Sequence, residues 1–367
     1  MSKTRRVVPD SDTDVTDGNP SPLLEGLVVD GSRGIYRVET SAGDVRCEIR
    51  GRLRKQLHYA QTSGTAFRNS VQRVKVHHHD PVAVGDRVRV LVTGHGTGMI
   101  EEVVARAGGA FTRRDPDAGQ GTLRSIVGLE QLVAVLAARA PEPHLGLLDR
   151  FLVTAESEDL RAVICINKVD LGVSPRLDAQ LAVYRALDYP VLLTSTAAGT
   201  GIDALRAQLA GRISAFLGPS GVGKSSLLNA LQPGLHERIS DVSAATGKGR
   251  HTTTGTRLFP LGASGGYIAD TAGIRALTLQ RETLDRLDTC FPEFRPYLGE
   301  CKHGDCTHLH EPRCAVRDAV GAGAIAPARY DSYARLLRGE GDPAESASRD
   351  VPYLWWSGIA GRGTSSE

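Results

Sequence analysis

The stretch Gly218-Pro-Ser-Gly-Val-Gly-Lys-Ser225 decides the fold. It matches the pattern G-x-x-x-x-G-K-[ST], follows a strand-like run at 212–217 and precedes a helix-like run at 226–231. Glycines let backbone N–H groups curl around phosphate oxygens, and the positive end of the following helix adds to the attraction. A glycine-rich turn that binds nothing is the alternative, but the adjoining Lys224 and Ser225 argue against it. The sequence therefore predicts a phosphate-binding loop between a strand and a helix.

The residues of this loop have separate roles in holding a nucleotide. Lys224 places a point charge at the β- and γ-phosphates, and the Ser225 hydroxyl is suited to coordinate Mg²⁺. Lys224 is therefore a predicted catalytic residue as well. The predicted nucleotide contacts of the loop are Gly218, Ser220, Gly221, Val222, Gly223, Lys224, Ser225 and Ser226.

A second motif indicates which base the nucleotide carries. Asn167-Lys168-Val169-Asp170 follows the apolar run 163–166, at the strand end where open α/β sheets bind ligands. An aspartate there can accept hydrogen bonds from both N1–H and N2–H of guanine, which adenine does not offer. Such tetrapeptides also occur in surface turns, but this one follows a buried-type strand. The sequence therefore predicts GTP and GDP as ligands, with contacts from Asn167, Lys168, Asp170 and Ser195.

A third motif, Asp270-Thr-Ala-Gly273, follows the strand-like run 267–269. An acid at that strand end can hold Mg²⁺ through water, and the Gly273 N–H can reach a γ-phosphate. In isolation, a tight glycine turn with a helix-capping aspartate would explain the motif better. Beside the other two motifs, we expect a γ-phosphate sensor.

The sequence around these motifs alternates between strand-like and helix-like runs. Such an alternation predicts an α/β domain with a mostly parallel sheet. Apolar runs occur at 132–136, 163–166, 191–193, 213–217 and 267–269, and helical stretches at 147–156, 177–187 and 224–231. In most GTPases the phosphate loop comes first and the Asn-Lys-x-Asp motif last, whereas here the guanine motif comes first. The predicted GTPase domain is therefore circularly permuted, which is tolerated when the natural termini lie close together.

Composition limits what the whole chain can be. Its 367 residues predict two or three domains, and a hydrophobic content of 41% excludes global disorder. A formal net charge of +2 excludes a strong overall field for nucleic acid or membrane. The apolar stretch 132–138 is too short to span a bilayer, and the N-terminus lacks a secretory signal. A soluble, cytoplasmic monomer without membrane contact is expected.

Two further domains are predicted on either side of the GTPase domain. Short β-type runs indicate a small all-β barrel, and short helices around a cysteine cluster indicate a small α-helical domain. The β-type runs lie at 27–29, 35–38, 45–49, 71–76, 88–92 and 99–104. The expected boundaries are a flexible tail at 1–22, the barrel at 23–106, a linker at 107–122, the GTPase domain at 123–281, the helical domain at 282–339 and a flexible tail at 340–367.

The cysteines of the helical domain lie beside several histidines, which in a reducing cell suggests metal rather than disulfides. Three thiolates and one imidazole suit a closed tetrahedral Zn²⁺ site with no position left for catalysis. The predicted ligands are Cys301, Cys306, His308 and Cys314. His303 and His310 are alternatives for the imidazole, and Cys290, beside two phenylalanines, is expected to be packed.

Together these features resemble one family. The permuted order, the run Gly249-Arg-His-Thr-Thr-Thr254, the Cys-x₄-Cys-x-His-x₅-Cys cluster and the preceding barrel are similar to the RsgA family of small-ribosomal-subunit-dependent GTPases, over roughly residues 23–339. The resemblance implies an OB-type barrel, a permuted GTPase domain and a zinc-bearing C-terminal domain, and it supports the zinc ligand set. It also implies a GTPase that binds the small ribosomal subunit and its rRNA late in maturation and is stimulated by the subunit.

The resemblance also bears on hydrolysis. Many GTPases place glutamine after the Asp-x-x-Gly glycine to orient the attacking water, but here Ile274 occupies that position. The resemblance points to His251 instead, since imidazole can position or deprotonate water near neutral pH. A solvated histidine without a role is the alternative. Thr252 or Thr253 would supply the hydroxyl for Mg²⁺ and the γ-phosphate; Ser225 and Thr253 are the magnesium ligands expected, although sequence does not choose between the threonines.

Two other functions stay open. One is a permuted GTPase acting on another RNA or RNA–protein particle, and the other is an RNA-binding scaffold that uses GTP only as a structural ligand, which Ile274 leaves possible. A local basic group in the barrel is consistent with RNA binding, and a solvated basic face explains it equally well. Its members are Arg50, Arg52, Arg54 and Lys55. Trp355 and Trp356 in the C-terminal tail have no assigned role.

Overall fold

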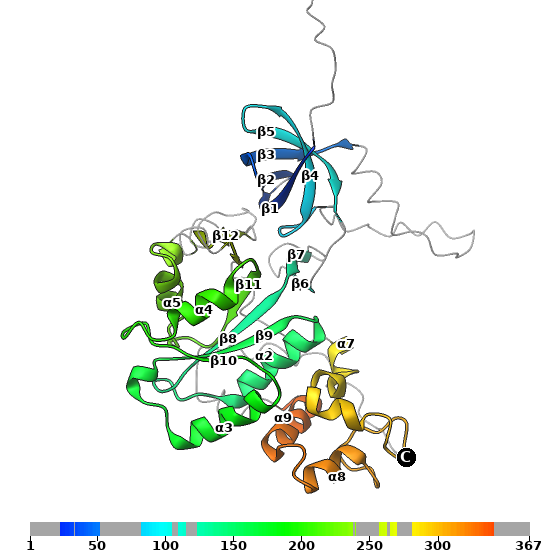
Figure 1. Cartoon of the computed structure of the whole chain (residues 1–367). Helices are drawn as coiled ribbons and strands as arrows, with labels where there is room; N and C mark the ends of the chain where they lie inside the picture. The colour runs from blue at the N-terminus through cyan, green and yellow to red at the C-terminus, as the bar shows by residue number, and fades with distance from the viewer. Residues whose placement is uncertain are drawn as a thin grey trace, which may run out of the picture.

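The computed structural model describes residues 23–32, 34–51, 82–104, 109–114, 123–237, 239, 257–262, 265–269 and 281–340. Figure 1 shows an N-terminal barrel, a central sheet with helices on its faces, and a small helical C-terminal domain. This arrangement confirms the predicted fold class. The predicted tail at 1–22, residues 341–367 of the C-terminal tail and the predicted β-type run 71–76 lie outside the described residues. Within the described part of the chain, no helix has the length and apolar character needed to cross a bilayer.

The barrel strands are β1 (Leu24–Ser32), β2 (Ile35–Thr40), β3 (Gly43–Ile49), β4 (Arg87–Gly94) and β5 (Thr97–Val103). They close in the order β1-β2-β3-β5-β4, with β3 and β5 parallel and the other neighbours antiparallel. Because side chains alternate across a strand, every second residue enters the barrel, as Val38, Val88 and Val90 do. A small closed barrel of this kind is OB-like, as predicted.

A two-stranded ribbon follows the barrel, formed by β6 (Gly109–Arg114) and β7 (Leu123–Leu129) in antiparallel pairing. The strand β6 lies within the expected linker 107–122, whose glycine, arginine and aspartate residues show no strand periodicity. Pairing with β7 therefore supplies a strand that local composition does not indicate. Ile126 and Leu129 of β7 are buried.

The central sheet has the order β10-β9-β8-β11-β13-β12. Its strands are β8 (Gln131–Ala137), β9 (Arg161–Asn167), β10 (Val191–Leu193), β11 (Ile213–Leu217), β12 (Leu258–Pro260) and β13 (Tyr267–Ala269). Neighbours are parallel except β12, which is antiparallel to β13. The predicted apolar runs coincide with all strands but β12, because strands buried on both faces have continuous apolar sequences.

Helices cover both faces of this sheet (Figure 1). The helices α2 (Leu145–Ser157) and α3 (Pro175–Ala186) pack in one core with Leu132 and Leu136 of β8. The helices α4 (Ile202–Leu209) and α5 (Lys224–Leu231) pack in a second core with Val133 and Val135. Alternate residues of β8 thus enter opposite cores.

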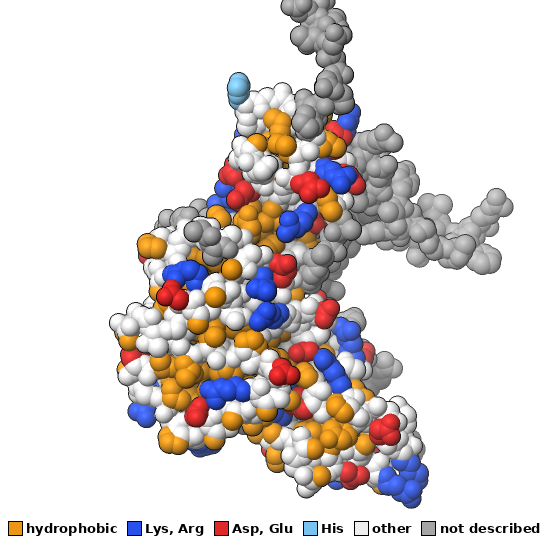
Figure 2. Space-filling model, viewed as in Figure 1, with side chains coloured by type: hydrophobic (Ala, Val, Ile, Leu, Met, Phe, Trp, Pro, Cys, Tyr) orange, Lys and Arg blue, Asp and Glu red, His pale blue; other side chains and the backbone are white. Residues whose placement is uncertain are grey.

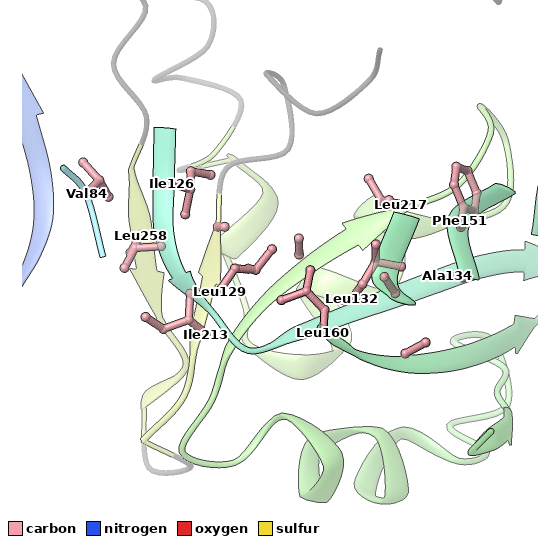
Figure 3. Close-up of a cluster of buried hydrophobic side chains, with 14 of the residues drawn as sticks. Val84, Ile126, Leu129, Leu132, Ala134, Phe151, Leu160, Ile213, Leu217 and Leu258 are labelled. Carbon is pink, nitrogen blue, oxygen red and sulfur yellow. The ribbon is translucent and has the colours of Figure 1, made fainter. Parts of the chain in front are cut away.

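The first core continues into the barrel. Val84, which precedes β4, belongs to the same buried cluster as Ile126 of β7 and Leu258 of β12, and Figure 3 shows these side chains close together. The apolar contact therefore joins the barrel to the far edge of the central sheet, away from α3 (Figure 1).

The C-terminal domain contains α7 (Arg281–Leu284), the 3₁₀ turns η5 (Leu287–Cys290) and η6 (Pro292–Tyr297), α8 (Ala315–Gly321) and α9 (Pro327–Arg338). Its core is aromatic: the rings of Phe291 and Phe294 stack at 5.2 Å, and Tyr333 meets Phe291 edge-on at 5.4 Å. Cys290 is buried in this core, as expected, and burial raises the pKa of its thiol. Val153 of α2 joins the same cluster, so the domain packs directly on the GTPase domain.

A buried arginine fixes this domain interface. Arg329 of α9 is 2% exposed, and its guanidinium donates to Asp149 of α2 at 2.5 Å and to Glu293 of η6 at 2.6 Å. The guanidinium also lies 4.6 Å above the ring of Phe291. Burial alone would lower the pKa of Arg329, but attraction to Asp149 and Glu293 raises it above the ordinary value. The arginine therefore stays charged and holds two buried carboxylates.

Replacing Arg329 by alanine leaves these two carboxylates buried without their partner. Because breaking a buried ion pair costs about 3–5 kcal/mol, we expect Arg329→Ala to lower the free energy of unfolding by that amount, measured by denaturant titration. Arg338→Ala, an exposed residue of the same helix, is the matched control and should change stability by less than about 0.5 kcal/mol. Equal effects of the two substitutions would contradict this role for the buried network.

Candidate nucleotide and metal sites

The phosphate loop lies between β11 and α5, as the sequence predicts. Two of its glycines occupy positions that exclude a side chain: Gly218 has φ +157°, and a Cβ there would lie 2.2 Å from the carbonyl oxygen of Val135. Gly223 has φ +92°, and a Cβ there would lie 2.5 Å from Nδ2 of Asn167. Both glycines are thus required for the loop to pass close to the neighbouring backbone and the guanine motif.

Lys224 and Ser225 begin α5, with Gly223 as the residue before the helix. The Lys224 ammonium donates to the carbonyl oxygens of Gly218 and Pro219, each at 2.7 Å, so its charge lies against the loop. Ser225 and Ser226 are exposed at the positive end of the helix. A hydroxyl and an ammonium at the start of a helix fit a nucleotide phosphate with its Mg²⁺.

The guanine motif lies against this loop. Asn167, at the end of β9, is 1% exposed, and its Nδ2 donates to the carbonyl of Val222 at 2.9 Å. Thr194, buried at the end of β10, donates from Oγ1 to Oδ1 of Asn167 at 3.2 Å. Asn167 therefore joins the base-binding and phosphate-binding loops, and Thr194 fixes its orientation. Sequence reasoning missed Thr194, although its place at the carboxyl end of a parallel strand was the available signal.

Asp170 and Ser195 are also brought together. The Ser195 hydroxyl donates to Oδ1 of Asp170, and the same oxygen of Ser195 accepts from the Ala198 N–H at 3.0 Å. Asp170 is exposed, so its carboxylate is accessible to a base. Lys168 has φ 62° in the left-handed region and donates to the carbonyl of Ala140 after β8. Left-handed backbone is uncommon at a non-glycine residue.

The remaining predicted residues of this site are not described by the structure. His251, Thr252, Thr253, Asp270 and Gly273 lie outside the described residues. In the sequence, the first three of these residues precede β12, which begins at Leu258, and the last two follow β13, which ends at Ala269. The phosphate loop, the guanine motif and Ser195 all follow strands of one parallel sheet, so they lie along its carboxyl edge.

The predicted zinc ligands form a compact cluster. Their ligand atoms all lie within 4.8 Å of one another. Nδ1 of His308 is 3.6 Å from Sγ of Cys301 and 3.3 Å from Sγ of Cys314, and the two sulfurs are 3.9 Å apart. Zn–S and Zn–N bonds of about 2.3 and 2.0 Å in a tetrahedron separate ligand atoms by about 3.5–3.8 Å. The donor set Cys301, Cys306, His308 and Cys314 therefore fits Zn²⁺, with His308 binding through Nδ1.

The surrounding groups hold these ligands in place. Cys314 precedes α8, and burial raises the pKa of its thiol, while the hydrogen bond that its sulfur accepts from the Arg317 N–H at 3.5 Å acts in the opposite direction. The Nε2 of His308 lies 3.6 Å from the Asp288 carboxylate. Burial raises the pKa of Cys306 to about 12 while the thiols face one another; a zinc ion would instead favour their deprotonation.

Glu311 organises the loop between the ligands, and sequence reasoning missed it. Its carboxylate accepts from the N–H groups of Thr307, Leu309 and His310 and from the Thr307 hydroxyl. Burial alone would raise the pKa of Glu311, but these hydrogen bonds hold it well below the ordinary value. The loop also carries His308 at φ 61°, so the carboxylate stabilises a predicted ligand in left-handed backbone.

The order of the loops along the chain defines the class of the protein. The base-binding motif at 167–170 comes before the phosphate loop at 218–225, yet both lie at one edge of one sheet. The fold and site thus define a P-loop GTPase with circularly permuted chain order.

Comparisons with known proteins identify the family. A family model described as RsgA GTPase matches residues 110–280. The small ribosomal subunit biogenesis GTPase RsgA of Gemmatimonas aurantiaca is 44% identical over 315 residues, 85% of this chain and 95% of that protein. Its namesake from Moorella thermoacetica is 40% identical over 86% of this chain and 96% of that protein. This chain therefore belongs to the RsgA family of GTPases, whose activity is GTP hydrolysis.

Two solved structures are similar to this chain over most of its length. YjeQ from Thermotoga maritima matches 87% of this chain and 98% of its own with 30% identity and a TM-score of 0.64. YloQ, described as a circularly permuted GTPase, matches 89% of this chain and 97% of its own with 25% identity and a TM-score of 0.61.

Guanine recognition by Asp170 is tested by changing its carboxylate to an amide. Asp170→Asn removes a charged acceptor for N1–H and N2–H, so we expect affinity for GDP to fall about a hundredfold. Affinity for xanthosine diphosphate should rise, since its base presents an acceptor where guanine presents the N2 donor. Fluorescence titration measures both. Asp178→Asn, which changes an exposed carboxylate on α3, is the control, and unchanged GDP binding by Asp170→Asn would contradict the assignment.

The zinc site is tested by single ligand substitutions. We expect His308→Ala and Cys314→Ser to reduce bound zinc, measured by elemental analysis of the purified protein, from about one ion per chain to a small fraction. His303→Ala, His310→Ala and Cys290→Ala should retain it. Because ligands must lose protons to bind, zinc should be released as pH falls. Full zinc content in His308→Ala with loss in His303→Ala or His310→Ala would reassign the imidazole ligand.

Proposed function

We propose that this chain hydrolyses GTP in association with the small ribosomal subunit, late in the maturation of that subunit, and that the subunit stimulates hydrolysis. The observation that carries this proposal is the length of the match: relatives named small ribosomal subunit biogenesis GTPase are covered over 95% and 96% of their own chains. The match thus includes the barrel and the zinc-binding domain as well as the GTPase domain. A ribosomal partner would place the protein in the cytoplasm.

In this proposal the chemistry is divided among the loops at the sheet edge. Lys224 and the phosphate-loop N–H groups would hold the phosphates, Ser225 and Thr253 would hold Mg²⁺, and Asp170 would bind guanine. Mg²⁺ would neutralise charge developing on the phosphates during hydrolysis. His251, with Thr252 or Thr253, would position water and the γ-phosphate, and Asp270 and Gly273 would sense that phosphate.

The missing glutamine supports the proposal that a partner stimulates hydrolysis. Ile274 cannot orient water, so we expect the free enzyme to be slow, with the subunit completing the catalytic arrangement, as closing loops do in other enzymes. The subunit itself would be recognised by local contacts of the barrel and the zinc-binding domain with rRNA. On the face shown in Figure 2, acidic and basic side chains are interspersed, which agrees with recognition by geometry rather than by an overall field.

The experiment measures GTP turnover by the purified protein with and without isolated small ribosomal subunits. We expect a low rate alone, an increase of at least about tenfold with subunits, and no measurable turnover for Lys224→Ala. His251→Ala should lose the stimulated rate while retaining GDP binding. Large ribosomal subunits at equal concentration control for nonspecific RNA.

The outcomes separate the alternatives. If small subunits do not increase GTP turnover but another RNA or RNA–protein particle does, the result would favour a permuted GTPase with a different substrate. Turnover that stays at background with every partner, together with tight GTP binding, would favour an RNA-binding scaffold in which GTP is structural.

A further inference from the structure

The barrel contacts the central sheet through a specific residue pair. Asp30 of β1 forms an antiparallel bridge with Arg257, and its carboxylate accepts a hydrogen bond from the Arg257 guanidinium. The side chains are 23% and 33% exposed, so solvent screens this pair less than the exposed ion pairs of the barrel. The two residues are 227 positions apart, and their contact joins two domains.

Arg257 lies between two segments that carry predicted catalytic residues. In the sequence it directly follows residues 249–256, which include His251 and the threonine run. It directly precedes β12, in which Leu258 pairs with Ala269 of β13. Ala269 is followed in the sequence by Asp270. The barrel therefore holds the sheet edge at the point where both segments join it.

The barrel also packs against β7 and against the first residue of β13. The Val127 N–H donates to the carbonyl of Val84 at 3.0 Å, and a Cβ at Gly85 would lie 1.8 Å from the carbonyl oxygen of Val127, so backbone packs on backbone. Tyr267, the first residue of β13, also faces the barrel: burial and then the Glu39 carboxylate, to which its hydroxyl hydrogen-bonds, raise the pKa of Tyr267.

We propose that Asp30 and Arg257 are positioning residues for GTP hydrolysis. The pair holds Arg257, the residue that directly follows the segment with His251 and the threonines, against the barrel. Neither residue belongs to the phosphate loop or the guanine motif. This inference rests on the proposed roles of those residues in hydrolysis. A small misplacement of catalytic groups costs up to about a hundredfold in rate, while the phosphate loop and Asp170, which bind the nucleotide, lie on other strands. Losing the pair should therefore lower kcat and leave binding intact.

The test uses the full-length protein without ribosomes. It measures the rate of single-turnover GTP hydrolysis by excess enzyme and, separately, the affinity for GDP. We expect Asp30→Asn and Arg257→Gln to lower the hydrolysis rate about tenfold or more, with GDP affinity and thermal midpoint almost unchanged. The double variant Asp30→Arg with Arg257→Asp restores the opposite charges and should return the rate to within about threefold of the parent. Arg37→Gln, which breaks the exposed pair with Asp44 inside the barrel, is the matched control.

Each contrary outcome is distinct. Unchanged rates in both single variants, or a reversed pair that is no faster than they are, would overturn the positioning role. Parallel losses of rate, affinity and thermal midpoint would show that the pair serves folding only. Absence of subunit stimulation in the parent, or a normal rate in His251→Ala, would count against the proposed function, whereas the pair is judged by the single-turnover rates of its own variants.

Discussion

The hydrogen bond from Asn167 to the carbonyl of Val222 is the contact on which the nucleotide site depends. It joins residues 55 positions apart, from motifs that occur in the reverse of the usual order. Permutation leaves this contact intact because a parallel sheet brings the carboxyl ends of neighbouring strands together whatever their order in the chain. Gly223 is glycine for the same reason, since Asn167 occupies the space of a side chain. The glycine in the loop and the order of the strands therefore both allow Asn167 to approach the phosphate loop closely.

Sequence reasoning recovers the features that depend on local pattern. The parallel strands β8, β9 and β11 are long apolar runs with both faces buried, and the phosphate loop has a fixed spacing. The predicted zinc ligands cluster in sequence and lie together in the structure. Each of these signals is contained in one short segment, so no knowledge of tertiary structure is needed to find it.

What the sequence did not reveal depends on pairing between distant segments. The strand β6 has no periodicity of its own and is made by β7. Arg329 is a surface-type residue on an amphipathic helix, and its burial follows only from the positions of Asp149 and Glu293. Thr194 and Glu311 lie close in sequence to Ser195 and His308. Their hydrogen bonds, however, form only because the folded backbone brings their partners near. The contact of Asp30 with Arg257 spans most of the chain.

The continuity of the barrel with the first core has a consequence for biosynthesis. The barrel is made first, but Leu258 and Arg257, which cover its contact face, follow Asp30 by more than 200 residues. At about 5–20 residues per second, that face waits about 10–45 s for its partner strand. Ile126 of β7 can cover part of this face earlier, but the contact with Leu258 forms only after the interval. The barrel therefore completes its contacts with the central sheet only when the C-terminal half of the chain has been made.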